Sequence, residues 1–469
     1  MSVETLLDGD GVALARAVKR GEVKALEVTE AALARIAVRN PVLNAYTDVT
    51  AERAQKSAKA IDAAIAAGKP VGPLAGVPIA VKNLFDVAGL PTRAGSKINR
   101  ELPPASADAP LIQRLEAQGA ILMGALNMGE YAYDFTGENV HDGPSRNPHD
   151  TTRMSGGSSG GSGSAVAGGL AHVALGSDTN GSIRVPSSFC GLFGLKPTYG
   201  RLTRAGTFPF VAAFDHLGPM ARSTRDLVAA YDAMVGPDPA DPACVTRKAE
   251  PVGAKLGRGI GDLKIGRLTG WFAKNGLDEA FAAVDQVAHA LKVTASVDLT
   301  GAERARGAAF LITMAEAGQF HLERLKARAD DFDPDTRDRL IAGALLPAAW
   351  ILNAQRIRRA FMAEVASAFE SFDVFIAPAT PMVAPAIGQK MMELGGQTMP
   401  VRANIGLFTQ PLSCVGLPVV AVPVRVKGQA LPIGVQVVAK PFREDLALRV
   451  ARHLEREGVS ISGVAPFKT

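Results

Sequence analysis

The segment from Arg153 to Arg184 constrains this 469-residue chain more than any other stretch. It reads RMSGGSSGGSGSAVAGGLAHVALGSDTNGSIR, in which glycines and serines precede an apolar run and a second Gly/Ser turn follows. Glycine adopts backbone angles that other residues avoid, and it lets a ligand approach the main chain. Serine adds hydroxyl groups. The segment therefore predicts a site built from backbone N–H groups and from a hydroxyl that acts as nucleophile or proton relay.

Three simpler interpretations fit this segment less well. A flexible Gly/Ser linker would not run directly into 165–167 and 172–175, which have the patterns of a helix and a buried strand. A phosphate-binding loop requires GxxxxGK[ST], or GxGxxG after a strand, and neither is present. Residues 156–160 match the GxSxG of a nucleophile elbow, but the residues before them are polar rather than strand-like.

Together with one lysine upstream, the segment resembles the amidase signature family, and the resemblance covers most of the chain. The motifs that carry it are GGSSGGS at 156–162, GSDTNGSIR at 176–184, GLKPT at 194–198 and VPIAVKN at 77–83. The resemblance implies an α/β fold in which helices cover both faces of a mixed central sheet. It also implies a Ser–cis-Ser–Lys triad, with Ser182 as nucleophile, Ser158 as the bridging serine after a cis peptide bond, and Lys82 as the base.

The residues themselves are compatible with this chemistry. Amide hydrolysis by a serine requires a base for the hydroxyl proton and an acid for the leaving amine. The seven histidines are scattered and form no recognisable motif. A lysine can replace histidine if burial keeps its amine neutral, and Lys82 ends the apolar run GVPIAV. Without the resemblance, Lys82 also fits a strand-terminal lysine that extends to solvent. Composition likewise does not choose among Ser158, Ser159 and Ser182 as nucleophile.

The oxyanion that develops during acyl transfer requires fixed hydrogen-bond donors. The resemblance assigns this task to the backbone N–H groups of Thr179, Asn180, Gly181 and Ser182. Asn180 stands where the family usually has a small residue, often glycine. Its side chain either contacts the substrate or braces the loop.

Three further residues are candidates for substrate binding. Arg184 lies two residues beyond the nucleophile, and its guanidinium can hold a carboxylate through two hydrogen bonds. A structural salt bridge is the alternative for this arginine. Tyr131 and Tyr133 lie on a helix predicted over 127–133, where they either line the pocket or serve in packing.

The composition is that of a globular protein, with 47% hydrophobic residues, 21% charged residues and a net charge of +5. No long basic run or basic–aromatic stripe is present, which argues against nucleic-acid binding. Cys190, Cys244 and Cys414 are too few and too scattered for a disulfide framework or a zinc site. The first residues carry no basic-then-apolar signal, and no apolar run approaches the ~18 residues of a membrane span. We therefore expect a cytoplasmic enzyme without metal, cofactor or membrane contact.

We expect a single domain over 1–469, because the strands before and after the variable half are predicted to join one sheet. Its parts are an N-terminal helical region at 1–70, a signature core at 71–235, a variable, mostly helical specificity region at 236–371, and C-terminal strands with a closing helix at 372–469. Within these parts, residues 12–39 are predicted to be helical, with a break near Gly21 and an end before Pro41. The charged stretch ERLKARADDFDPDTRDRL at 323–340 is predicted to be a solvated face.

The resemblance extends to members of the family that release ammonia from a small carboxylated biuret in cyanuric-acid degradation. The segments that carry it lie at 82–109, 177–186, 206–220 and 377–388. It implies hydrolysis of a C–N amide bond through an acyl-Ser182 intermediate. It also implies a small helical partner that resembles the C subunit of tRNA-dependent amidotransferases, in a homodimer or heterotetramer. The alternatives are the glutaminase component of a glutamyl-tRNA amidotransferase, a general small-amide amidase, and an inactive scaffold, against which the intact triad residues argue.

Overall fold

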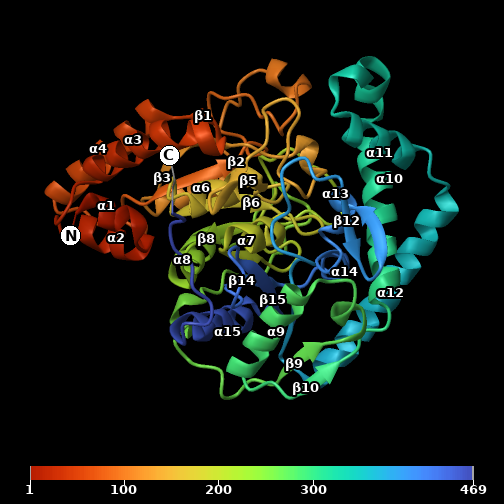
Figure 1. The fold of residues 1–469 in the computed structure, drawn as a ribbon. Helices are drawn as coiled ribbons and strands as arrows, with labels where there is room; N and C mark the ends of the chain where they lie inside the picture. The colour runs from red at the N-terminus through yellow and green to blue at the C-terminus, as the bar shows by residue number, and fades with distance from the viewer. Residues whose placement is uncertain (1, 467–469) are drawn as a thin grey trace.

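An eleven-stranded sheet forms the centre of the computed structural model, which describes residues 2–466 (Figure 1). Residue 1 and residues 467–469, the two ends of the predicted domain, lie outside the described residues. The strand order is β1-β3-β2-β6-β8-β7-β14-β15-β11-β9-β10. In this order the strands span Tyr46–Val49, Ile121–Leu126, Pro78–Lys82, Val173–Ser177, Leu217–Ala221, Phe193–Lys196, Val419–Val424, Ile433–Ala439, Val374–Pro378, Ile265–Leu268 and Ala295–Val297.

The sheet is mixed, as predicted. β2 is parallel to β3 and β6, and β9 is parallel to β10 and β11, whereas the other neighbouring pairs are antiparallel. β2, β6, β14 and β15 are buried along their whole length. Strands covered on both faces are apolar throughout rather than alternating, which explains the short apolar runs in the sequence.

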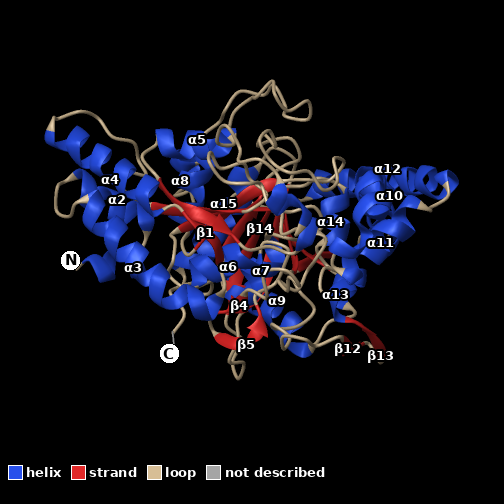
Figure 2. Ribbon diagram, turned by 90° about the horizontal axis from the view of Figure 1, so that it is seen from above, coloured by secondary structure: helices blue, strands red, loops and turns tan. Residues whose placement is uncertain are grey.

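Helices cover both faces of the sheet (Figure 2). Those on one face are α5 (Pro110–Ala117), α8 (Thr224–Met234) and α15 (Glu444–Arg456). Those on the other are α6 (Gly160–Ala167), α7 (Arg184–Cys190) and α9 (Asp278–Ala290). α6 and α7 come from the Gly/Ser-rich segment and its continuation, so this segment packs directly against the central strands.

The N-terminal helices pack beside one end of the sheet (Figure 1). They are α1 (Val3–Asp8), α2 (Gly11–Lys19), α3 (Ala25–Leu43) and α4 (Ala51–Ala66). The prediction that the helix ends before Pro41 is wrong, because α3 passes through Pro41 and ends at Leu43. A proline this close to the end removes a single helical hydrogen bond. Asn44, with φ of 49°, closes the helix by donating its N–H to the carbonyl of Asn40 at 2.8 Å.

The variable half forms a layer of helices on the side of the molecule opposite to α1–α4 (Figure 1). Its long helices are α10 (Ala302–Arg328), α11 (Pro334–Ala344) and α12 (Ala348–Ser371), with α13 (Val401–Asn404) and α14 (Gln410–Cys414) nearby. Two small hairpins complete the fold, β4–β5 (Arg146–Asn147, Asp150–Met154) and β12–β13 (Met391–Leu394, Gln397–Pro400). In the part of the chain that the structure describes, no single helix is long and apolar enough to cross a membrane. α11 and α12 meet those criteria only as a pair bent by 96°.

The segment after β3 is not the predicted helix. It contains one 3-10 turn, η2 (Glu130–Ala132), in which Tyr131 has φ of 49°. Neighbouring segments accept its backbone hydrogen bonds. The N–H of Gly129 donates to the carbonyl of Ser158 at 3.1 Å, and that of Tyr131 donates to the carbonyl of Ala94 at 2.8 Å. Because these bonds replace helical ones, the segment stays irregular.

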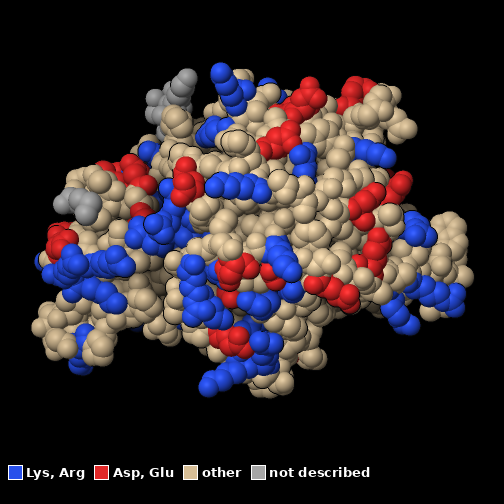
Figure 3. All heavy atoms as spheres, turned by 90° about the horizontal axis from the view of Figure 1, so that it is seen from below, with Lys and Arg blue, Asp and Glu red and all other residues tan. Residues whose placement is uncertain are grey.

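The surface carries charges of both signs. The chain has 51 Lys and Arg against 46 Asp and Glu. Basic and acidic side chains intermingle over the face that Figure 3 shows. On this face the small positive excess is therefore spread out rather than gathered into one patch.

Candidate active site

The structure brings Lys82 and Ser158 into direct contact. Lys82 is the last residue of β2, and Ser158 lies just before α6, after a cis peptide bond from Gly157. The Nζ of Lys82 donates to Oγ of Ser158 at 2.6 Å and to Oγ of Ser177 at 2.8 Å. Both Lys82 and Ser158 are fully buried. The amine therefore has two hydroxyl partners and is shielded from bulk solvent.

Strand pairing explains this meeting of distant residues. β2 and β6 are parallel neighbours, with Ile79 opposite Val173 and Val81 opposite Leu175. The carboxyl ends of parallel neighbours lie at the same edge of a sheet, where sites commonly form. Lys82 at the end of β2 therefore lies beside Ser177 at the end of β6. The loop that follows β6 begins at the same edge.

The surroundings of Lys82 favour its neutral form. Burial lowers the pKa of Lys82 from 10.5 to about 7, although the carboxylates of Asp215, Asp178 and Asp134 act in the opposite direction. Desolvation acts in this way because it penalises the charged ammonium more than the neutral amine. At neutral pH a large share of the amine is uncharged and able to accept a proton.

The loop between β6 and α7 carries Ser182 and a row of unpaired backbone donors. Ser182 is 3% exposed, and within residues 2–466 its hydroxyl makes no hydrogen bond. The N–H groups of Thr179, Asn180, Gly181 and Ser182 likewise donate to no acceptor in the described chain. Unpaired donors next to a free hydroxyl are suited to an anion that forms beside that hydroxyl.

Gly181 and Asn180 fix the shape of this loop. Gly181 has φ of 143°, and a Cβ there would lie 2.2 Å from Oγ1 of Thr409. That hydroxyl donates to the carbonyl of Asn180 at 2.6 Å. The side-chain Nδ2 of Asn180 donates to Oγ1 of Thr313 on α10 at 2.8 Å, while its Oδ1 is buried without a partner in the described chain. The amide of Asn180 thus braces the loop and leaves one unpaired acceptor.

A pocket with an empty volume of about 390 Å³ opens in front of Ser182. Thr179, Asn180 and Ser182 form part of its wall. The remaining wall includes Tyr133, Phe210, Phe310, Thr313, Arg339, Arg402 and Gln410. Of the two candidate tyrosines, Tyr133 therefore lines the pocket, and its buried hydroxyl has no partner within residues 2–466.

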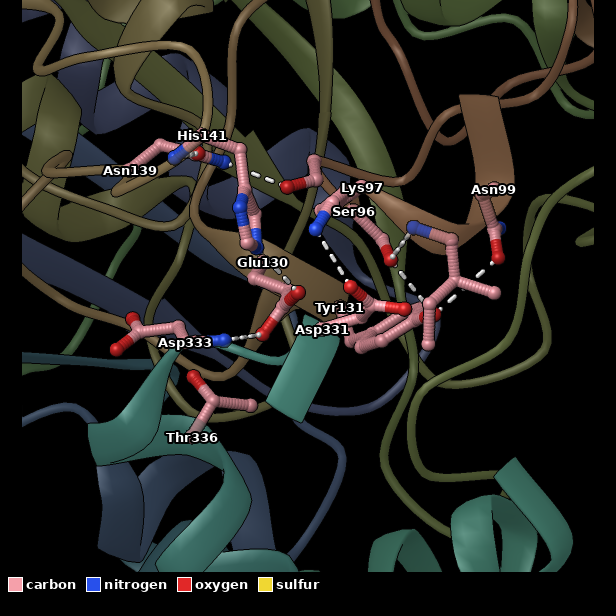
Figure 4. A network of polar contacts seen from close by, with 12 residues as sticks. Ser96, Lys97, Asn99, Glu130, Tyr131, Asn139, His141, Asp331, Asp333 and Thr336 are labelled. Atoms are coloured by element: carbon pink, nitrogen blue, oxygen red, sulfur yellow. Dashed lines mark hydrogen bonds and ion pairs between the residues drawn. The ribbon is translucent and has the colours of Figure 1, made fainter. Parts of the chain in front are cut away.

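Tyr131 does not line this pocket. Its hydroxyl accepts from Ser96 at 2.7 Å and donates to Asn99 at 3.2 Å (Figure 4), and neither partner lines the pocket of Ser182. Its ring packs against His321, with centroids 4.1 Å apart. The hydrogen bonds and the ring contact assign Tyr131 to packing rather than to substrate binding.

Glu130, beside Tyr131, ties this segment to α11. It accepts from Nε2 of His141 at 2.8 Å and from the backbone N–H of Asp333 at 2.8 Å (Figure 4). Asp333 is the N-cap of α11. The network therefore fixes the start of the helix that carries Arg339.

Arg184 is not available to a substrate, which corrects the role predicted for it. It is fully buried, and its guanidinium donates twice to the carboxylate of Asp178, at 2.9 Å in each case. Its remaining groups donate to Gln436 at 2.6 Å, to the carbonyl of Thr409 at 3.1 Å and to Ser413. Burial alone would raise the pKa of Asp178, but Arg184 outweighs it and holds that pKa at about 2. The ion pair joins Asp178 in the Ser182 loop to Arg184 in α7 and so stabilises the conformation of that loop.

Two other arginines line the pocket, and no pattern in the sequence indicated either of them. Arg402 meets three carboxylates, those of Asp134, Asp333 and Asp335, at 3.3, 2.7 and 2.9 Å. Arg339 has no carboxylate within 4.0 Å in the described chain. It donates to the carbonyls of Asp335 and Tyr133 and lies 3.9 Å from the Tyr133 ring centroid.

Arg339 belongs to the stretch 323–340 that we predicted to be a solvated face. That prediction is wrong for this residue, because α11 turns it into the pocket. Arg402 comes from a segment about sixty residues further along the chain. Its position depends on long-range packing that no local pattern reveals.

The structure joins Lys82 to Ser158 but shows no hydrogen bond between Ser158 and Ser182 among the described residues. A buried lysine held against a serine, a second serine with a free hydroxyl and a row of backbone donors are nevertheless the groups that a serine-based amide hydrolase requires. Comparison with known proteins agrees with this class. The chain belongs to the amidase family, whose model, described as Amidase, matches residues 27–448. It is therefore a hydrolase of C–N amide bonds.

Two relatives are similar to this protein over nearly the whole length of its chain. The AtzE component of 1-carboxybiuret hydrolase from Pseudomonas sp. (strain ADP) is 52% identical over 450 residues, with 96% of this chain and 98% of that protein covered. The A component of glutamyl-tRNA(Gln) amidotransferase from Anaeromyxobacter dehalogenans (strain 2CP-C) is 37% identical, with 93% of each covered.

Two solved structures share the fold over nearly their whole length. One, described as "An unexpected vestigial protein complex reveals the evolutionary origins of an s-triazine catabolic enzyme", has a TM-score of 0.96 and 51% identity, covering 97% of this chain and 100% of that one. The other, described as "Crystal structure of amidase", has a TM-score of 0.86 and 32% identity, covering 96% and 100%.

Proposed function

We propose that this protein hydrolyses a C–N amide bond of a small anionic biuret-type substrate, such as 1-carboxybiuret, and releases ammonia through an acyl-Ser182 intermediate. The observation that carries the proposal is the 2.6 Å contact of Lys82 with Ser158, together with the free Ser182 hydroxyl and the four N–H groups of the β6–α7 loop, which are unpaired within the described chain. Among the described residues no hydrogen bond joins Ser158 to Ser182, so the substrate-bound relay between these two serines is part of the proposal. The contact between Lys82 and Ser158 supplies a base and a proton relay. The loop that carries Ser182 supplies a nucleophile and donors for the oxyanion.

In the first half of the reaction, the Oγ of Ser182 attacks the amide carbon and passes its proton to Ser158. Ser158 passes its own proton to the neutral amine of Lys82. The tetrahedral oxyanion accepts hydrogen bonds from the N–H groups of residues 179–182, and donors of this kind are each worth about 3–4 kcal/mol in known sites. Collapse breaks the C–N bond, and the proton returns through Ser158 to the departing nitrogen, which leaves as ammonia.

In the second half, water attacks the acyl-Ser182 ester. Lys82 takes the water proton through Ser158, and a second tetrahedral oxyanion meets the same N–H donors. Its collapse returns the proton to Ser182 and frees the acid product. The same lysine serves as base and then as acid in each half, so its pKa of about 7 is close to the optimum for work near neutral pH.

We infer that Arg339 holds the negative charge of the substrate. It lies on the wall that also carries Ser182, and among the described residues it is the pocket arginine without a carboxylate in reach. Arg402 is already paired with three carboxylates. A guanidinium matches a carboxylate geometrically and gains from the low dielectric of a closed pocket. The unpaired acceptor of Asn180 supports recognition of an N–H group on the same substrate.

The substrate class rests on similarity. The relative that is 52% identical is named for its action on 1-carboxybiuret. The description of the structure with a TM-score of 0.96 concerns a protein complex and the evolutionary origins of an s-triazine catabolic enzyme. A small anionic amide also suits a pocket whose wall holds both Ser182 and Arg339, which has no carboxylate within 4.0 Å among the described residues.

Ammonia release from 1-carboxybiuret, biuret, glutamine and propionamide tests the proposal. Arg339→Met should cost about 2–5 kcal/mol of transition-state binding for the anionic substrate, and much less for neutral biuret. Arg337→Met is the matched control, because Arg337 lies on the same helix, bonds Asp338 and does not line the pocket. Equal losses on both substrates would remove Arg339 from this role. Turnover of glutamine without turnover of biuret compounds would assign the chain to a glutaminase instead.

We also propose that the chain works in the cytoplasm with a small helical partner, as a homodimer or heterotetramer. The similar structure described as a protein complex supports a partner. α3 exposes Val38 at 64% and Val42 at 38%, which supports contact with the partner at the N-terminal region.

Co-expression with a neighbouring small reading frame, followed by light scattering, should give a mass above that of the lone chain. Val38→Asp should release the partner, whereas Ile461→Asp, at a site 63% exposed near the C-terminus, should not. Retention with both variants would contradict this placement.

A further inference from the structure

A second hollow lies against the catalytic pocket. We call it the outer groove, and it has an empty volume of about 1040 Å³. Phe310 and Ala403 line both hollows. The other groove residues used below are Arg304, Arg306, Gly307, Leu311, Ile357 and Asn404. The shared residues show that the two spaces meet at one common wall.

The spacing of residues along α10 explains how one side chain comes to separate the two spaces. Thr313 follows Phe310 by three residues and faces the catalytic pocket, where it accepts from Asn180. Gly307 precedes Phe310 by three residues and faces the groove. Residues three apart lie on the same side of a helix. Phe310 therefore stands between a catalytic position and a groove position on one helical face. Ala403, the other shared residue, contributes no side chain beyond a methyl group. Arg306 on the groove side donates to Gln410 of the catalytic pocket at 2.9 Å and lies beside this common wall.

The outer groove has room for an apolar group. Leu311 and Ile357 form apolar walls, while Arg304 and Asn404 lie among the polar residues of its lining. A Cβ placed on Gly307 would have no other atom within 4 Å, so the part of the groove in front of Gly307 is open. An apolar chain that passed the common wall would be received by apolar surface rather than by unpaired polar groups.

We propose that Phe310 determines specificity by closing the acyl side of the pocket against the outer groove, which restricts the enzyme to small substrates. The inference rests on the proposed acyl-Ser182 chemistry and adds to it the residue that limits acyl size. Removal of the ring joins the two spaces. The enlarged site then accepts uncharged amides with an aryl or alkyl acyl chain, whose far end occupies the outer groove.

The test compares kcat/KM for 4-phenylbutyramide with that for propionamide. In Phe310→Ala this ratio should rise by about tenfold or more over wild type, since each methylene received by an apolar pocket is worth roughly tenfold or more. Leu311→Ala is the matched control, because Leu311 lines the groove and not the catalytic pocket. Its ratio should stay near that of wild type. Gly307→Leu added to Phe310→Ala should refill the space and return the ratio toward wild type.

A binding measurement on an inactive variant distinguishes a failure of this inference from a failure of the proposed function. In a Ser182→Ala background, calorimetric titration should show that Phe310→Ala gains affinity for 4-phenylbutyramide and not for propionamide. This measurement needs no turnover. An unchanged affinity and an unchanged ratio in Phe310→Ala overturn the inference, as does an equal change in Leu311→Ala. Absence of ammonia release from biuret compounds, with the affinity gain intact, rejects only the proposed substrate.

Discussion

The burial of Lys82 makes a quantitative prediction for the pH dependence of catalysis. The lysine works only when neutral, and burial places its pKa at about 7. Its neutral fraction is then about one half at pH 7, one tenth at pH 6 and one hundredth at pH 5. Because acid protonates the working form, kcat/KM should rise about tenfold per pH unit below 7 and level off above it.

The assay is ammonia release at low substrate concentration between pH 5 and 9, since kcat/KM reports groups of the free enzyme. Far-UV circular dichroism at each pH separates loss of activity from unfolding. Lys82→Arg supplies the matched variant, because a guanidinium keeps a charged hydrogen-bond donor but does not become neutral in this range. Above pH 7 its kcat/KM should fall by roughly 10²–10⁴-fold relative to wild type, and the rise of kcat/KM with pH through 7 should disappear. Constant activity from pH 8 down to 5.5 in folded protein would refute the assignment of Lys82 as base.

Three further predictions concern stability and loop geometry. Burial lowers the pKa of His321 from 6.5 to about 3, so the unfolded chain binds a proton that the folded chain excludes. His321 alone should contribute a loss of about 2 kcal/mol of unfolding free energy between pH 7 and 5, because the unfolded chain gains the proton as the pH falls below 6.5. Urea unfolding of His321→Leu should therefore show a pH 7 to 5 loss about 2 kcal/mol smaller than that of wild type. Asp178→Asn leaves the charge of Arg184 buried without its carboxylate and should destabilise by about 3–5 kcal/mol in the same assay. Gly181→Ala should lower kcat by roughly 10²-fold or more, with circular dichroism unchanged, because its Cβ collides with Thr409 and displaces the backbone donors. Wild-type turnover in that variant would contradict the role of the loop.

Local patterns were sufficient for the centre of the fold. The run PIAVK forms β2 and VVAVPV forms β14, because strands covered on both faces are apolar along their whole length. The same reasoning placed Lys82 at a buried strand end, where the structure has it. Its contact with Ser158 came from the resemblance of the motifs rather than from periodicity.

Local patterns were not sufficient where distant segments meet. Arg184 is neutralised by Asp178 nearby, but Gln436 and Ser413, more than two hundred residues away, complete its shell. The sequence indicated Arg339 as one charge on a solvated helix, and only the packing of α11 brings it into the pocket that Ser182 also lines. Sequence spacing carries no information about such contacts, because tertiary packing decides which face of a polar helix is covered.

The central claim is that Ser182 becomes acylated, and rapid-quench mass spectrometry tests it most directly. Trypsin cleaves after Arg153 and Arg184, so one peptide carries Ser158, Ser159 and Ser182 together. Fragmentation of this peptide during steady-state turnover should place the acyl mass on Ser182 alone, and Lys82→Arg should abolish the adduct. An adduct on Ser158 or Ser159, or full turnover of Ser182→Ala, would contradict the account.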